Sequence, residues 1–583
     1  MVEEDRLKEI ERKKTEWEEG TLKKGLDRFG IKKSPNKFYT PLDIKGHDFL
    51  EKVGFPGEYP FTASNYPVTT PRKETGEDIE LVRAGGYAGY GGPEATRDYY
   101  REMIAQGRRR GGPNIAFDLP TQCGHDSDEP ISQGEVGKTG VAVDSLRDFE
   151  VIYEAFTGDN DLDKIASNWT INAPTNIILA MYIALAEKRG IPLHKLRGTP
   201  QNDILKEFIA RGTYIFPPKP SMRMTRDTIT YCTKHMPLMN TISICMYHIR
   251  EAGATAAQSL GFTFSNAIAY IQLAVDAGLN VDDFVPHFTF LPQESGSMEI
   301  LKEIARARAA RRMWAKILKE RFKAENPGIM RMSGLGGANI GSYDRTTQRL
   351  LNNLTRIVLG CVASALSGGD FYMGAPPGGF PYDEPLGLGH SLEAVQLSVD
   401  AERIIREEAK LREVIDPFAG SYYMESLTDQ IEEEAWGIIN KIDTMGGAPA
   451  AIENGYMQQE IARSSYARQK RIESGEDVIV GVNKHVGENE LEIRITRLVP
   501  HPYDPEKRAK AEEEQLVKLA QLKKERDNQQ VKRTLKQLKE SAQDQGVNLI
   551  PPILNAVKAY ATIGEICGIL REVFGEYEAY KAI

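Results

Sequence analysis

Short apolar runs alternate with amphipathic helical patterns through the middle of the chain, from about residue 80 to residue 500. Each run has the length of a buried strand, and a segment with helical spacing of its apolar positions follows it. The predicted strands are 113–119, 168–172, 241–248, 288–291 and 329–332, with a predicted helix at 176–188. This alternation predicts an α/β fold with a parallel sheet. We expect a (β/α)8 TIM barrel, although the pattern does not exclude an open sheet.

The pattern changes at both ends of the chain. Residues 1–45 are predicted to form a charged helix and an extended arm, which contacts another subunit or else is a disordered tail. Residues 46–500 would form the barrel that binds the substrate. Residues 501–583 begin with a stretch rich in Lys, Glu and Gln and regain helical spacing at Val547–Tyr580. That last segment is either a docking module for a partner or a helix packed on the chain's own surface.

Composition narrows the classes of function. The 583 residues carry a formal net charge of −9, which argues against nucleic acid or an anionic membrane as the main partner. The first twenty residues lack the apolar core of a signal peptide, and no apolar stretch has the length of a membrane span. The five cysteines form no CxxC pair, which is typical of reduced thiols in a cytoplasmic protein. We expect no metal site.

Polar residues collect where the predicted strands end, and the active site of a barrel lies at these ends. Tyr247 and His248 end one apolar run, and Glu251 follows three residues later. A lone histidine is more often structural than functional. Arg211 follows the apolar helix that begins after Gln201. Because a buried arginine keeps its charge, it needs an anion, which could be a substrate carboxylate or an internal acid.

Two further segments attract attention through their composition. Residues 124–129 (GHDSDE) could suggest a metal site, but a turn stabilised by Asp and Ser side chains is the favoured interpretation. Residues 83–93 (RAGGYAGYGGP) have the glycines that permit close approach to a ligand. No GKS or GKT follows them, so this is not a phosphate loop, and a flexible surface loop is the alternative.

Several ordered segments carry a resemblance to a known family. They are YPFT at 59–62, AFDLPT at 116–121, GEVGKTGVAVDS at 134–145, QNDILKE at 201–207, YHIREAGA at 247–254, IDPFAGSYYMESLT at 415–428 and VIVGVNK at 478–484. From about Gly57 to Asn483 the chain resembles the methylmalonyl-CoA mutase family. The resemblance implies a TIM barrel that threads a CoA thioester along its axis. It also implies adenosylcobalamin held over the barrel mouth, and a radical rearrangement of the carbon skeleton in a cavity closed to water.

The resemblance also assigns roles to residues. His248 would hydrogen-bond the thioester carbonyl, and Arg211 would pair with a free substrate carboxylate. Tyr87 would wedge between substrate and cobalamin. The remaining expected contacts are Gln201, Tyr247, Thr170, Thr199 and Tyr66 with the substrate, Phe117 and Leu119 with the corrin face, and Glu251 and Glu384 with the adenosyl ribose.

Departures from the family pattern alter this picture. The CoA-binding TMYxxRPW is absent after Tyr66, His287 stands where a CoA-phosphate arginine is expected, and Met246 replaces the glycine of the family's GYH. Arg211 and His248 are retained. The retained Arg211 implies a substrate with a free carboxylate, of succinyl or malonyl type. Glycines at 85, 86, 91, 92 and 212 could make room for a substituent bulkier than that of methylmalonyl-CoA.

The motif by which this family binds cobalamin is also missing. None of the nine histidines lies in a DxHxxG context. We therefore expect a separate small cobalamin-binding subunit with that motif, and a large subunit that assembles with it into a heterotetramer. A catalytically silent scaffold or regulatory subunit of such a mutase is the alternative.

Overall fold

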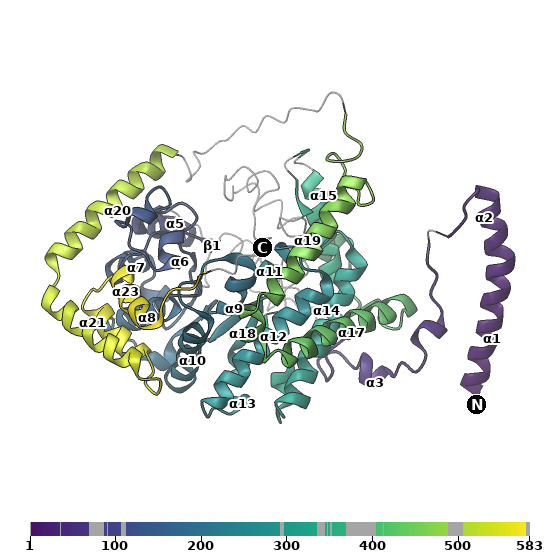
Figure 1. Cartoon of the computed structure of the whole chain (residues 1–583), viewed down its shortest axis with the longest axis horizontal. Helices are drawn as coiled ribbons and strands as arrows, with labels where there is room; N and C mark the ends of the chain where they lie inside the picture. The colour runs from purple at the N-terminus through teal and green to yellow at the C-terminus, as the bar shows by residue number, and fades with distance from the viewer. Residues whose placement is uncertain are drawn as a thin grey trace.

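The computed structural model describes most of the chain, and its parallel strands lie at the centre of the body (Figure 1). The described residues are 2–34, 36–68, 87–89, 91–105, 112–291, 297–334, 344–346, 348–349, 352–368, 401, 404–411, 413–487 and 505–578. Within them the strands are β1 (Tyr87–Ala88), β2 (Asn114–Ala116), β3 (Ala166–Thr170), β4 (Arg197–Pro200), β5 (Ile242–Cys245) and β6 (Phe288–Leu291).

The strands pair in parallel and in chain order. One sheet has the order β1-β2-β3-β4, and β5 pairs with β6. The two sheets meet where Gly198 in β4 bridges Met239, just before β5. In the same place the Ser243 N–H donates to the Gln201 carbonyl at 2.8 Å. The α/β class with parallel strands is thereby confirmed. Closure into an eight-stranded barrel is not among the contacts of the described residues, so it stays a prediction.

Helices connect and cover these strands. In the first half of the body they are α5 (Pro93–Ala105), α6 (Leu119–Cys123), α7 (Leu146–Tyr153), α8 (Thr175–Lys188), α9 (Ile204–Lys206), α10 (Pro218–His235), α11 (Tyr247–Glu251), α12 (Ala256–Asp276) and α13 (Val281–Phe284). Then come α14 (Ile300–Lys316), α15 (Asn352–Leu366), α17 (Tyr422–Thr444), α18 (Ala448–Glu453) and α19 (Tyr456–Ser474). Twelve residues of α8 are buried, on all its sides, because its sequence is apolar all round. Such a helix belongs in a core.

The structure matches some predicted elements and corrects others. β6 and α8 lie where the apolar runs predict them. The predicted strand 241–248 ends at Cys245, because Met246 already has helical dihedral angles and α11 begins at Tyr247. The predicted strand 329–332 is wrong. Residues Pro327–Met330 form a 3-10 turn, which the Asn326 side chain caps by accepting from the Gly328 N–H at 2.9 Å.

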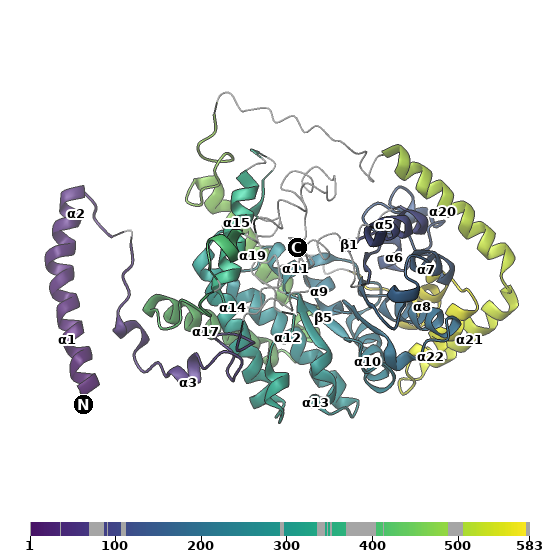
Figure 2. The same cartoon turned by 180° about the vertical axis from the view of Figure 1, so that it is seen from behind.

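The two end regions of the described chain differ in how they contact the body. Helices α1 (Val2–Trp17), α2 (Lys23–Phe29) and α3 (Phe49–Lys52) precede the body, and the first two stand apart from it (Figures 1 and 2). By contrast, α20 (Pro505–Glu525), α21 (Asn528–Gln543), α22 (Ile550–Lys558) and α23 (Ile563–Phe574) lie along the side formed by α5–α8 (Figure 2).

Apolar burial holds the second of these regions in place. The buried side chains of α22 and α23 are Ile550, Ile553, Leu554, Ala556, Val557, Ile563, Ile566, Cys567 and Leu570. Each large apolar side chain removed from water contributes about 1.5–3 kcal/mol. The segment 547–578 therefore packs on the chain's own surface, while the domain boundaries at 45 and 500 stay predictions. None of the described helices has the length and hydropathy needed to cross a bilayer.

Candidate functional site at the carboxyl ends of the strands

The parallel strands bring several predicted residues to one edge. Thr170 ends β3, Gln201 directly follows β4, and Tyr247 and His248 begin α11 directly after β5. Because neighbouring parallel strands end at the same edge of a sheet, these side chains share the region where α/β enzymes place their sites. Thr199 lies within β4, where its Oγ1 accepts from Asn240 Nδ2 at 2.8 Å.

His248 lies in a surrounding that keeps it neutral. Burial lowers the pKa of His248 well below its usual 6.5, and the positive charges of Lys206 and Arg211 lower it further. Its Nδ1 is 3.2 Å from the Cys245 thiol sulfur. The ring of Tyr247 packs beside it, with 4.9 Å between the ring centroids. A neutral imidazole has one N–H. If Nδ1 accepts a hydrogen bond, the proton lies on Nε2; if Nδ1 donates one, Nε2 carries no proton.

Arg211 ends a π-helical turn, Glu207–Arg211, that continues α9. Its side chain is 23% exposed, and its Nη1 lies 3.4 Å from Glu207 Oε1. The second oxygen of Glu207 accepts from Thr213, at 3.0 Å from the backbone N–H and 2.6 Å from the hydroxyl. Glu207 also forms an ion pair with Lys206, and neither side chain of that pair is exposed.

Gln201 and Asn172 complete this group of side chains. Asn172 Nδ2 donates to Gln201 Oε1 at 2.9 Å and to Glu207 Oε1 at 2.6 Å. Lys206 Nζ donates to Gln201 Oε1 at 2.7 Å. Although burial opposes it, the charges of Lys206 and Arg211 hold the pKa of Glu207 below its usual value, so its carboxylate is ionised. We call Asn172, Gln201, Lys206, Glu207 and Arg211 the Lys206 cluster.

Other predicted residues lie in different surroundings. The Arg331 guanidinium lies over the Tyr66 ring, 4.4 Å from its centroid. Phe117 is fully buried, whereas Leu119 is 37% exposed. Glu251 is half-buried on α11. Glu384 and the side chain of Tyr87 lie outside the described residues, so the roles expected of them stay predictions.

A cavity of about 370 Å³ opens beside Leu119. Its lining residues are Leu119, Pro120, Cys123, His125, Ile131, Ser132, Glu135, Tyr214, Ile215, Arg571, Glu576 and Tyr577. Tyr577, which follows α23, packs edge-on against Phe208 in the turn that ends with Arg211 and against Tyr214 beyond it. Its N–H donates to the Ile215 carbonyl at 3.1 Å. The segment after α23 therefore buttresses the loop that follows Arg211.

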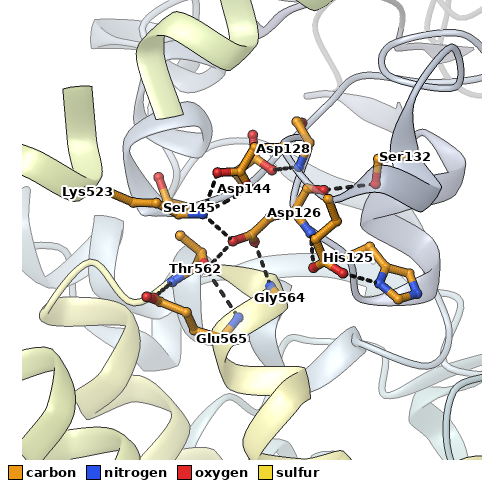
Figure 3. Close-up of polar contacts among 12 residues, drawn as sticks. His125, Asp126, Asp128, Ser132, Asp144, Ser145, Lys523, Thr562, Gly564 and Glu565 are labelled. Carbon is orange, nitrogen blue, oxygen red and sulfur yellow. Dashed lines mark hydrogen bonds and ion pairs between the residues drawn. The ribbon is translucent and has the colours of Figure 1, made fainter. Parts of the chain in front are cut away.

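The segment 124–129 contacts the C-terminal helices. The Asp126 carboxylate accepts from the Thr562 hydroxyl and the Gly564 N–H, each at 2.7 Å, and Lys523 Nζ lies 3.0 Å from it (Figure 3). Among the described residues no group of three His, Cys, Asp or Glu side chains is placed to hold a metal ion. These contacts agree with a turn whose acidic side chains have a structural role.

Two more carboxyl groups lie beside Asp126. The Gln515 amide donates to Asp144 at 2.7 Å and to Asp148 at 3.1 Å. Burial raises the pKa of Asp144 well above its usual value, and the charges of Asp148 and Asp126 raise it further. We call Asp126, Asp144, Asp148, Gln515, Lys523 and Thr562 the acidic latch. It joins α20 and α23 to the body.

Asn172, Lys206, Glu207 and Cys245 hold the site together and were not predicted as site residues. Lys206 and Glu207 were part of a matching segment, but charged neighbours on a helix are usually solvated, so nothing singled them out. Asn172 ends a predicted strand and Cys245 lies in another. Placement at a strand end could have found Asn172 and Cys245, whereas Lys206 and Glu207 lie in the helical segment after β4 and no local signal marks them.

The chain is similar in sequence to several known proteins. The family model described as methylmalonyl-CoA mutase matches residues 31–576. The 2-hydroxyisobutanoyl-CoA mutase large subunit of Aquincola tertiaricarbonis is 39% identical over 92% of this chain and 90% of its own length. Methylmalonyl-CoA mutase of Escherichia coli (strain K12) is 37% identical over 84% of this chain and 65% of its own length. Mitochondrial methylmalonyl-CoA mutase of Homo sapiens is 35% identical over 90% of this chain and 66% of its own length.

Proposed function

Because the chain belongs to the methylmalonyl-CoA mutase family, we propose that it rearranges the carbon skeleton of an acyl-CoA thioester with the help of adenosylcobalamin. The family depends on cobalamin and acts on CoA thioesters, and the relatives are mutases, hence isomerases. One observation carries the proposal: His248 and Gln201 follow the carboxyl ends of β5 and β4, and Arg211 lies close enough to His248 for its charge to lower the pKa of the imidazole.

His248 and Cys245 together define the polar contact to the thioester. When the Cys245 thiol donates to Nδ1, the imidazole carries its proton on Nε2. That N–H can donate to the thioester carbonyl and stabilise the negative charge that grows on its oxygen. Tyr247, Thr170 and Thr199 would complete the polar wall around the substrate.

The substrate class follows from Arg211. Its guanidinium is partly exposed and has one end on Glu207, so the other end can bind a substrate carboxylate. We infer a substituted succinyl- or malonyl-type CoA ester, bulkier than methylmalonyl-CoA. The relative from Aquincola tertiaricarbonis is named for a hydroxyacyl thioester. A hydroxyacyl substrate is therefore the second candidate.

The residues present fit a contact with one edge of the cofactor. Leu119 is exposed and lines the cavity together with the apolar side chains of Pro120 and Ile131. Glu251 lies on α11, three residues after His248. When bound, adenosylcobalamin supplies the carbon radical that removes a hydrogen atom from the substrate. We infer that β1–β6 belong to a (β/α)8 barrel whose cavity keeps water from that chemistry.

A partner subunit is part of the proposal. The chain spans about two thirds of the length of its methylmalonyl-CoA mutase relatives and 90% of a relative named as a large subunit. We infer a small subunit with a DxHxxG motif that brings cobalamin to the Leu119 edge, and a cytoplasmic heterotetramer.

The test combines the chain with such a subunit, adenosylcobalamin and a panel of CoA thioesters. The panel contains methylmalonyl-, ethylmalonyl-, benzylmalonyl- and 2-hydroxyisobutanoyl-CoA, and the readouts are isomer formation and the cob(II)alamin signal. We expect turnover of a carboxylated thioester with a large substituent, which Arg211→Ala abolishes. Turnover of the hydroxyacyl ester alone would transfer the assignment to the second candidate.

The same assay addresses the alternative of a silent scaffold. A scaffold would bind the small subunit without turning over any ester, and His248→Ala would change nothing. Turnover that is lost in His248→Ala but retained in His194→Ala, an exposed histidine away from the strand ends, excludes the scaffold.

A further inference from the structure

Lys206 and Glu207 are an ion pair buried completely inside the body. Both side chains are 0% exposed, and they are adjacent in the chain, where α9 passes into the π-helical turn. Taking two charges out of water is costly, and hydrophobic residues of similar volume would often be at least as stable. A pair of this kind therefore calls for a reason other than stability.

One reason is the orientation of the Gln201 amide. The side-chain oxygen Oδ1 of Asn172 accepts from the Asp203 N–H at 3.0 Å, so Asn172 must present its NH2 to Gln201. Lys206, which can only donate, points to the same oxygen of Gln201 at 2.7 Å. Two donors on one oxygen determine which end of the Gln201 amide is oxygen. The NH2 of Gln201 is then the end that can donate to an acyl oxygen.

A second reason is the placement of Arg211. Glu207 Oε1 receives Lys206, Asn172 and Arg211, while Glu207 Oε2 receives the N–H and hydroxyl of Thr213. One carboxylate thus holds both the guanidinium and the loop directly after it. Without Lys206, this carboxylate would be buried beside a single, partly exposed cation.

We propose that Lys206 and Glu207 are a buried positioning pair, in which Lys206 orients the Gln201 amide and Glu207 aims the Arg211 guanidinium at the free carboxylate of the acyl-CoA substrate. This inference rests on the proposed function and deepens it. It names the groups that decide between a carboxylated and an uncharged acyl group. Neither residue needs to touch the substrate.

The first test is kinetic and uses the complete enzyme. Glu207→Gln keeps the shape of the side chain but removes the charge that holds Arg211. We expect KM for the carboxylated thioester to rise about tenfold or more, with kcat changed much less, since a lost charge-assisted contact is worth a factor of this size. The hydroxyacyl ester should lose less than the carboxylated one.

A matched control separates positioning from the general cost of breaking a buried pair. Glu425 pairs with Arg308 between α17 and α14, and both side chains are 0% exposed. Glu425→Gln should lower stability as Glu207→Gln does, but leave KM unchanged. Equal KM values in wild type, Glu207→Gln and Glu425→Gln would overturn the proposal.

The second test needs no turnover, so it tests the positioning pair even when the proposed function fails. The His248 ring can be titrated by NMR in the chain alone, with histidine labelled and His248→Gln used for assignment. We expect Lys206→Met to raise the midpoint of His248 by removing a nearby positive charge, and Glu425→Gln to leave it unchanged. An unchanged midpoint in Lys206→Met would show that Lys206 does not face the site and would overturn the inference.

Discussion

The Lys206 cluster and the acidic latch are both buried polar networks, but their charges are balanced in opposite ways. In the Lys206 cluster two cations, Lys206 and Arg211, surround one carboxylate, Glu207, whose pKa is lowered. In the latch the carboxyls of Asp126, Asp144 and Asp148 have raised pKa values, chiefly through burial.

This difference separates two uses of buried charge. An excess of cations keeps an arginine ready for an anionic ligand and keeps His248 neutral. An excess of carboxyls instead binds backbone N–H groups, hydroxyls and an amide from distant helices. The first network can select a substrate, whereas the second joins parts of the chain.

The largest effect is expected from breaking the charge balance of the Lys206 cluster. Lys206→Met leaves Glu207 buried without its principal cation, and such a loss costs about 3–5 kcal/mol. Urea denaturation followed by tryptophan fluorescence measures it. Lys206→Met/Glu207→Gln should recover part of this loss. If the double variant is as unstable as the single one, the lost packing of the lysine rather than its charge is the cause.

A smaller and more local effect is expected in the latch. Asp126→Asn places an NH2 group among the donors of Thr562, Gly564 and Lys523, and an unsatisfied buried group costs about 1–3 kcal/mol. We expect faster hydrogen exchange in α23 and little change in α12. Asp128→Asn is the control, because Asp128 is 41% exposed and, of Thr562, Gly564 and Lys523, contacts only Lys523. Equal exchange in the two variants would contradict a latch.

The two networks should also respond to pH with opposite signs. The pKa of Asp144 is raised above its usual 3.8, so its contribution to stability is present below that value and is lost as the pH rises through the raised pKa. The pKa of Glu207 is lowered below 4.5, so its contribution is present above 4.5 and is lost as the pH falls through the lowered pKa.

Hydrogen exchange, corrected for the intrinsic rate, measures this contrast. As the pH rises from the usual range of carboxyl groups through the raised pKa of Asp144, we expect protection in α23 to fall while protection in residues 201–213 stays constant. Asp144→Asn should flatten the response of α23. A parallel response of both segments would remove the distinction between the networks.

The smallest effect concerns the tautomer of His248. Cys245→Ala removes the sulfur beside Nδ1, whereas Cys245→Ser keeps a donor there. One neutral hydrogen bond is worth about 0.5–1 kcal/mol, so kcat/KM should fall about two- to fivefold in the alanine variant and less in the serine variant. The nitrogen shifts of the imidazole report the tautomer directly. A serine variant as impaired as alanine would assign the loss to packing.

The sequence predicted what local patterns can encode and little of what distant contacts decide. The apolar run 288–291 was predicted as a strand and is one, because its alternating burial is encoded by neighbouring residues alone. The run 329–332 has a similar composition, but Pro327 and the Asn326 cap turn the chain there. The roles expected of Arg211 and His248 came from a resemblance. Their proximity to Lys206 depends on how β4 and β5 come together, which no local pattern shows.

The acidic latch also depends on distant contacts that local sequence patterns do not show. The acids of 124–129 contact Thr562 and Gly564, which lie in a segment whose alternatives, docking to a partner or packing on the body, remained open in the sequence. A hydrogen bond between residues so distant in sequence leaves no trace in either segment alone.

That separation has a consequence for how the protein is made. Thr562 follows Asp126 by 436 residues, so at about 5–20 residues per second the ribosome delivers it about 20 to 90 s later. Until then Asp126, Asp144 and Asp148 are in water, where repulsion and hydration favour their ionised forms. The strands β2–β4 can pair early in synthesis, because their partners are close in sequence. Docking of α20–α23 is therefore a late event. Because α22 packs on α8, nascent chains expose that apolar surface of α8 for most of their synthesis.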